Sequence, residues 1–247
     1  MTRDEVIEEI ELSKREGRSA NLADAHLFGK DLHGADLRNA NLTNADLACA
    51  DLGYANLADA DLGYANLADA DLGYANLRCA DLRNANLTNA DLGYANLRCA
   101  DLRNANLINA NLADADLGYA NLAGANLRDV DLHATNLGGA NLAGANLRDV
   151  DLHATNLGGA NLHLAELGST QVLQIGPIGS RGDYLVAKLF NEGETEIMTG
   201  CFIGTLSEFR HDVLSTHADG SKYRKQYLSA IGVIDEVFDL KSIESSK

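Results

Sequence analysis

Leucine recurs at every fifth residue of this chain from Leu22 to Leu167, thirty times without a gap. An α-helix repeats after about 3.6 residues and a β-strand after about two, so neither element has this period. A fixed short period is instead typical of a solenoid, in which similar units stack on one another. A core of stacked leucines also explains how a chain with 5% aromatic residues and no Trp can fold.

The residues around each leucine are almost as regular as the leucine itself. The chain has Ala two residues before it in 25 of the thirty units, and Asp or Asn directly before it in 28. This unit, A(D/N)LXX, resembles the pentapeptide-repeat family over residues 20–169. The resemblance implies an all-β fold: a right-handed quadrilateral β-solenoid with four pentads per coil and therefore about 7.5 coils.

Two internal duplications support a coil of 20 residues. Residues 121–140 recur unchanged at 141–160, and residues 71–90 recur at 91–110 with one change, Thr88 to Ile108. A copy of one whole coil leaves every residue on its own face, whereas a copy of another length moves it to a neighbouring face. We predict that the leucine and the small residue two before it point inward, and that the other three residues of each pentad point outward.

The flanking segments have a different composition. Residues 1–19 are predicted to form an N-terminal capping helix over 3–16, with an apolar stripe of Val6, Ile7 and Ile10 that covers the first coil. Residues 170–247 are predicted to form a small α+β domain of three strands, the third over 194–203, followed by two helices. This domain resembles those that follow the repeats in some bacterial and phage proteins, a resemblance that implies no particular activity.

The charge of the chain restricts its partners. Acidic residues outnumber basic ones 36 to 20, a net charge of −16, which disfavours direct binding to nucleic acid or to an anionic membrane. We therefore expect a protein partner, in particular a basic nucleic-acid-binding protein. The charged start, MTRDEVIEEI, lacks the apolar core of a signal peptide, and we expect a cytoplasmic protein.

The residue types that carry chemistry form no recognisable constellation. Seven His and four Cys occur without metal-ligand spacing, and no glycine-rich phosphate loop or nucleophile-base pattern is present. We predict no catalytic, cofactor-binding or metal-binding residues, and no enzyme activity. Catalysis within residues 170–247 is kept as the least favoured alternative.

Aligning the repeats with a period of 20 residues reveals one acidic face. Its pentads are centred on the leucines from Leu32 to Leu152, and it has no outward Lys or Arg, whereas on the Leu37 face three Asp are balanced by three Arg. The candidate interaction residues are Asp31, Asp51, Asp71, Asp91, Asp114, Asp131, Asp151, Tyr54, Tyr74 and Tyr94. Since Asp or Asn before the leucine can also bond to turn backbone, plain surface solvation is the competing interpretation.

These features favour a non-catalytic interaction or scaffold protein, with a rigid rod that presents the acidic face and a C-terminal domain that binds a partner or forms a homodimer. The alternative, implied by the resemblance, is a DNA mimic that inhibits or protects a DNA-binding enzyme such as a type II topoisomerase. Residues 20–169 carry 19 acids and 8 bases. Their net charge of −11 is about half that of a duplex of similar length, which has one phosphate charge per about 1.7 Å.

Overall fold

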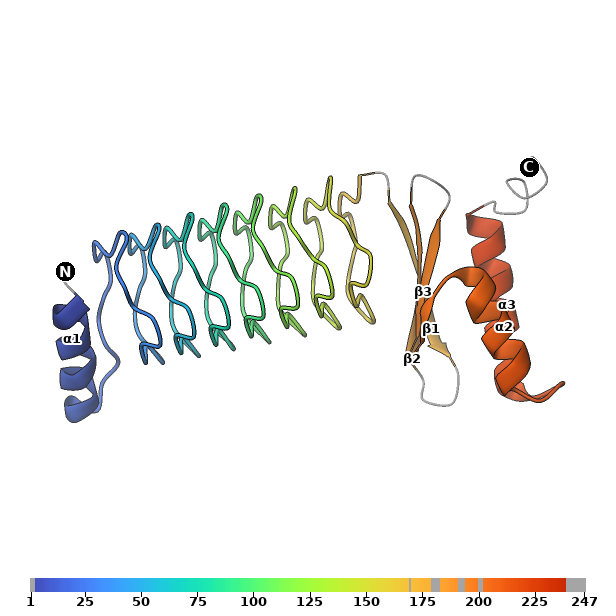
Figure 1. Ribbon diagram of the computed structural model, residues 1–247, viewed down its shortest axis with the longest axis horizontal. Coiled ribbons are helices and arrows are strands. Elements are labelled where there is room, and N and C mark those ends of the chain that lie inside the picture. The colour runs from blue at the N-terminus through green and yellow to red at the C-terminus, as the bar shows by residue number, and fades with distance from the viewer. Residues whose placement is uncertain (1–2, 169, 179–182, 191–193, 200–201, 239–247) are drawn as a thin grey trace. The chain divides into compact units, whose positions relative to one another are not determined.

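The computed structural model describes residues 3–168, 170–178, 183–190, 194–199 and 202–238 (Figure 1). The chain divides into two compact units, Met1–Gly168 and Ser169–Lys247. The first unit consists of helix α1 (Arg3–Glu16) and the repeats. The elements of the second unit are β1 (Gln171–Ile178), β2 (Asp183–Leu189), β3 (Thr195–Thr199), β4 (Phe202–Gly204), α2 (Leu206–Thr216) and α3 (Lys222–Val237).

The repeats wind into coils of 20 residues, visible in Figure 1 as a row of similar turns. The residue before each leucine forms a parallel bridge with the residue 20 positions later, from Asn21–Asn41 to Asn146–Glu166. At mid-rod the N–H of Leu92 donates to the carbonyl of Asn111 at 2.7 Å. Each pentad therefore hydrogen-bonds to the coil on either side, and four pentads complete one coil.

Each pentad turns a corner immediately after its leucine. At mid-rod the N–H of Ala95 donates to the carbonyl of Leu92 at 3.0 Å, which closes the turn. The residue before that alanine has a positive φ, such as 58° at Tyr94, a conformation that costs a non-glycine residue about 1 kcal/mol or more. Burial of a leucine in every pentad, worth about 1.5–3 kcal/mol, offsets this cost.

The interior of the coils follows the predicted pattern, with two refinements. Every central leucine from Leu22 to Leu157 is buried, while the last two, Leu162 and Leu167, are half-buried. Thr135 and Thr155 replace the small inward residue, and their buried hydroxyls donate to backbone carbonyls of the preceding coil at 2.7 and 3.0 Å. Polar groups can therefore enter this core only where a carbonyl accepts their hydrogen bond.

Helix α1 covers the first coil and has the range predicted from the sequence (Figure 1). Val6 and Ile10 are buried, whereas Ile7, which was expected in the same stripe, is only half-buried. The carboxylate of Glu9 accepts from Arg18 at 2.6 Å and from the N–H of Asn21 at 2.9 Å. These bonds join the helix to the start of the repeats, where unpaired backbone would otherwise be exposed.

The second unit is a four-stranded antiparallel sheet in the order β1-β2-β3-β4, with α2 and α3 packed against it. The single third strand expected over 194–203 was wrong. Thr199 lies opposite Phe202, so the segment is a hairpin, and the glycine at position 200 within the run was the overlooked signal. The core shared by the sheet and the helices contains Leu185, Ala187, Leu189, Ile197, Leu206, Phe209, Val213, Ala230, Ile231, Ile234 and Phe238.

Candidate interaction face

The face of the repeats centred on Leu32 to Leu152 is here named the Asp–Tyr face. The structure stacks the residues that precede these leucines into one column through consecutive parallel bridges, in the order Asp31, Asp51, Asp71, Asp91, Asn111, Asp131, Asp151. A second column, three residues further along each pentad, contains Tyr54, Tyr74, Tyr94 and Asp114. All the acidic and tyrosine side chains of both columns are exposed except that of Asp51, which is half-buried.

Each aspartate of the first column caps its own turn. Oδ1 of Asp51, Asp71 and Asp91 accepts the N–H two residues later at 3.0, 2.8 and 2.9 Å. The Oδ2 atoms of these three side chains have no hydrogen-bond partner among the described residues. One carboxylate oxygen is therefore structural, and the other is available to a ligand.

Asparagine does the same structural task elsewhere in the repeats and adds a bond that aspartate cannot form. Oδ1 of Asn136 accepts from the N–H of Gly138 at 3.0 Å, while its Nδ2 donates to Asp116 of the preceding coil at 2.8 Å. An aspartate stacked on an aspartate lacks this donor and places like charges side by side. The run of four aspartates from Asp31 to Asp91 thus costs stability that asparagine would not cost, which argues against solvation as its only role.

The tyrosines form an aromatic ladder beside the aspartates. The rings of Tyr54 and Tyr74 stack with centroids 4.9 Å apart, and those of Tyr74 and Tyr94 with centroids 4.8 Å apart. Two contacts at the ends of this ladder were not predicted from the sequence. The ring of His33 tilts onto Tyr54 at 5.4 Å, and a hydrogen bond to the carboxylate of Asp114 raises the pKa of the Tyr94 phenol. The 20-residue alignment places Asp114 one coil after Tyr94, and His33 one coil and one residue before Tyr54, but it does not determine the side-chain rotamers that make these contacts.

The arginines of the repeats lie on the other three faces, and most are neutralised there. Six of the seven in the described repeats form an ion pair with a carboxylate, and the pairs are Arg38–Asp36, Arg83–Asp81, Arg98–Asp116, Arg103–Asp101, Arg128–Asp129 and Arg148–Glu166. On the Asp–Tyr face, which carries no Arg, two aspartates pair with histidine, His33–Asp51 and His153–Asp151. The acidic charge of this face is therefore the least compensated on the repeats.

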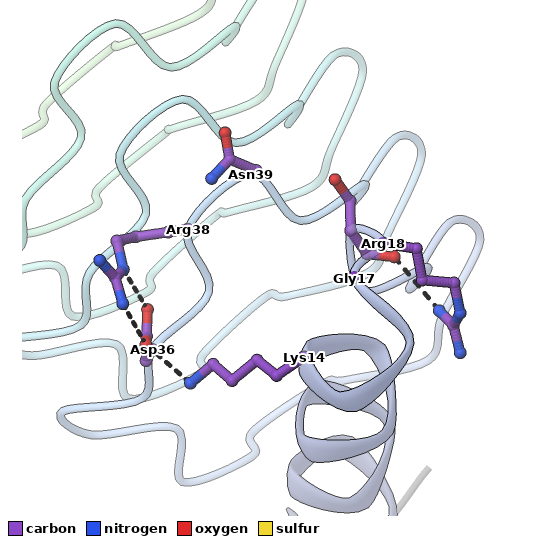
Figure 2. Close-up of a pocket in the computed structure, with 7 residues that line it drawn as sticks. Lys14, Gly17, Arg18, Asp36, Arg38 and Asn39 are labelled. Atoms are coloured by element: carbon purple, nitrogen blue, oxygen red, sulfur yellow. Dashed lines mark hydrogen bonds and ion pairs between the residues drawn. The ribbon is translucent and has the colours of Figure 1, made fainter.

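A pocket of about 320 Å³ lies at the corner between α1 and the first coil (Figure 2). Figure 2 shows Asp36 between Arg38 and Lys14, with contacts of 2.7 Å to both. The hydrogen bonds from Arg38 are the main cause of the strongly lowered pKa of Asp36. Because Asp36 accepts from both cations and Arg18 pairs with glutamates, the basic groups of this pocket hold the cap in place rather than forming an open anion site.

The described ranges of the chain contain no group of three or more His, Cys, Asp or Glu side chains that could hold a metal ion. None of the helices described is both long and apolar enough to cross a membrane.

Stacked 20-residue coils with one leucine per corner define the class of protein as a four-sided repeat solenoid. Pentapeptide repeats were matched in eight copies over residues 18–57, 55–93, 65–104, 95–133 and 125–163, well over half of the chain. The chain therefore belongs to the pentapeptide-repeat family, whose members fold as right-handed quadrilateral β-helices.

Solved structures of the same family are similar to this chain. HetL of the cyanobacterium Nostoc, a pentapeptide repeat protein involved in heterocyst differentiation regulation, is 31% identical and covers 68% of this chain and 93% of its own, with a TM-score of 0.27. Rfr23 of the cyanobacterium Cyanothece is 27% identical over 66% of this chain and 97% of its own, with a TM-score of 0.29. QnrB1, a plasmid-mediated fluoroquinolone resistance protein, is 20% identical over 60% of this chain and 82% of its own, with a TM-score of 0.28. The comparison with curated proteins gave no match.

Proposed function

We propose that this chain is a non-catalytic protein-interaction protein whose repeats present the Asp–Tyr face to a basic surface of a partner protein. The observation that carries the proposal is the uneven compensation of charge. Arginines pair with acids on the other three faces, while the Asp–Tyr face has no Arg, and its one lysine, Lys30, is half-buried at an inward position. Long-range attraction depends on the summed field, so a basic partner is steered to this face.

The chemistry of the two columns fits arginine and lysine side chains. The available Oδ2 atoms of Asp51, Asp71 and Asp91 can accept charge-assisted hydrogen bonds, and the exposed tyrosine rings next to them can stack with guanidinium groups. Hydrogen bonds between coils hold the backbone beneath these side chains on both sides. A preorganised face of this kind loses little conformational entropy on binding.

The experiment compares two triple variants of equal charge change. Asp51→Asn, Asp71→Asn and Asp91→Asn together keep the turn-capping oxygen and remove three charges from the Asp–Tyr face. Asp61→Asn, Asp81→Asn and Asp101→Asn remove three charges from the same pentad position on another face, where arginines neutralise two of them. In affinity capture from a lysate of the source organism, basic proteins retained by the wild type and by the second variant should be lost with the first. Identical capture by all three proteins would contradict the proposal.

A second candidate is DNA mimicry, and the observation that favours it is the unbroken column of carboxylates from Asp31 to Asp91. The arginines on the other faces restrict such a mimic to docking through one face, because a basic partner that wrapped the rod would meet Arg78 and its neighbours. The test is DNA supercoiling by a type II topoisomerase in the presence of micromolar protein. An effect on the enzyme that the Asp–Tyr face variant lacks would support mimicry, and no effect of the wild type would end it.

We extend the proposal to the second unit as a recognition or self-association module. Several apolar side chains of its described residues are exposed, namely Ile203, Leu214, Leu228 and Val233. Exposed apolar side chains contribute to binding when they form a continuous patch. Sedimentation velocity of the full chain over a range of concentrations tests self-association, which would appear as a concentration-dependent mass that Leu214→Ser and Leu228→Ser abolish.

A further inference from the structure

Two cysteines are stacked on the Leu37 face, away from the Asp–Tyr face. Cys79 and Cys99 occupy the same pentad position in successive coils, whose strands bridge at Asn76 and Asn96. Their N–H groups donate to the next coil at 2.9 and 3.0 Å, and their φ angles are 57° and 58°. Because the two backbones have the same conformation, the two Cα–Cβ bonds run parallel, one coil apart.

The distance between coils suits a disulfide. Neighbouring strands lie about 4.8 Å apart, and a disulfide bridges Cα atoms separated by about 4.4–6.8 Å. The tyrosine ladder, which occupies the same pentad position on another face, repeats at 4.8 and 4.9 Å between ring centroids. Burial chiefly, and in addition the neighbouring Cys99 thiol, raise the pKa of the Cys79 thiol, as expected for two adjacent thiols. Closing the bridge requires rotation of both side chains and a small approach of the two Cβ atoms, which a disulfide holds about 3.5–4.5 Å apart.

The two thiols differ in exposure. Cys99 is exposed, whereas Cys79 is half-buried, and burial raises the pKa of the Cys79 thiol. An exposed thiol is the one that a dissolved reagent reaches first. Cys99 is thus suited to the first reaction, and Cys79 to the step that follows it.

We propose that Cys79 and Cys99 form an oxidisable dithiol, a modification site that small disulfides such as oxidised glutathione convert into a bridge between coils. The Cys99 thiolate attacks one sulfur of oxidised glutathione, which forms a mixed disulfide and releases one glutathione thiolate. The Cys79 thiolate then attacks the Cys99 sulfur, closes the bridge and releases the second glutathione. Two thiols are oxidised, one disulfide is reduced, and the two thiol protons pass to the two released glutathiones.

The chain contains a matched control in Cys49. It is exposed, and it occupies the same pentad position on the Leu27 face, but the residues one coil away are Gly29 and Asp69. A mixed disulfide formed at Cys49 consequently has no stacked thiol to resolve it. Cys201, the fourth cysteine, lies outside the described residues.

The experiment exposes the full chain to oxidised glutathione, alkylates the remaining thiols and maps the tryptic peptides by mass spectrometry. Cleavage after the flanking arginines puts Cys79 and Cys99 in two identical peptides, CADLR at 79–83 and 99–103, while Cys49 lies in 39–78 and Cys201 in 189–210. We expect two CADLR peptides joined by a disulfide in a protein that runs as a monomer without reductant. The Cys49 peptide should gain one glutathionyl group.

The variant Cys79→Ser removes only the resolving thiol, so Cys99 should then retain a glutathionyl group as Cys49 does. A wild type in which the CADLR peptides carry glutathionyl groups, stay reduced, or are joined only in covalent dimers would overturn the proposal. The dithiol lies on a different face from the aspartates, so this result is independent of the proposed partner binding.

Discussion

Replacing Leu92 by alanine tests the inward stacking of the leucines. Leu92 is fully buried, and backbone hydrogen bonds hold its coil on both sides. The N–H of Leu72 donates to the backbone carbonyl of Asp91 at 2.6 Å, and the N–H of Leu92 donates to that of Asn111 at 2.7 Å. A backbone fixed in this way cannot collapse into the space that the side chain leaves. We therefore expect the upper part of the range for buried Leu→Ala changes, a loss of about 3–5 kcal/mol.

The control is the same substitution at Leu164, which lies at an outward position and is 77% exposed. Leu164→Ala is expected to change stability by less than about 0.5 kcal/mol. The assay is urea unfolding of the full chain followed by far-ultraviolet circular dichroism, with the midpoint as the readout, because stacked repeats need not unfold in one step. Equal shifts of the midpoint for the two variants would refute the inward assignment.

Three further predictions concern the caps and the asparagine ladder. The bond from Arg18 lowers the pKa of Glu9 from 4.5 to about 2, so Glu9 stabilises the fold above pH 4.5 and that contribution is lost as the pH falls towards 2. Glu9→Gln should therefore lower the Tm near neutral pH and have little effect near pH 2; an unchanged difference across this range would contradict the ion pair. Thr205→Ala removes the N-cap of α2 and should cost about 1 kcal/mol in calorimetry, whereas no change would argue against the capping box. Asn136→Asp loses the 2.8 Å bond to Asp116 and stacks two carboxylates, so urea unfolding should show a loss of about 1–2 kcal/mol that high salt reduces.

Periodicity made the repeats predictable, because the spacing of identical residues determines which of them stack. The interval of 20 residues predicts that Asp51 stacks next to Asp71 and Tyr54 next to Tyr74, and the structure has these neighbours. Contacts that depend on side-chain rotamers could not be read in this way. The bond from Tyr94 to Asp114 is an example.

The second unit was harder to predict because no repeat constrains it. Its third strand had to be inferred from a local run of apolar residues, and such a run does not show where the chain reverses between Thr199 and Phe202. The start of helix α2 was easier to predict from the sequence. Thr205 and Glu208 form the reciprocal capping box that their spacing of three residues predicts, with 3.2 Å from the Glu208 N–H to the Thr205 hydroxyl.

The aspartates of the repeats differ in the partners of their carboxylates. Every aspartate before a leucine can cap its turn, as Asp81 does, but Asp81 also receives the guanidinium of Arg83, and that ion pair lowers its pKa. Asp71 and Asp91 have no Arg or Lys partner among the described residues. Turn capping alone therefore does not account for their charge.

The most direct test of the account is the affinity of a captured basic partner for three proteins: the wild type, the Asp51, Asp71 and Asp91 triple Asn variant, and the Asp61, Asp81 and Asp101 triple Asn variant. Isothermal titration at low and at physiological salt gives the Kd of each. If the Asp–Tyr face is the docking surface, the first variant binds more weakly and with a smaller salt dependence, while the second resembles the wild type. Equal Kd values and equal salt dependence for the two variants would contradict the account.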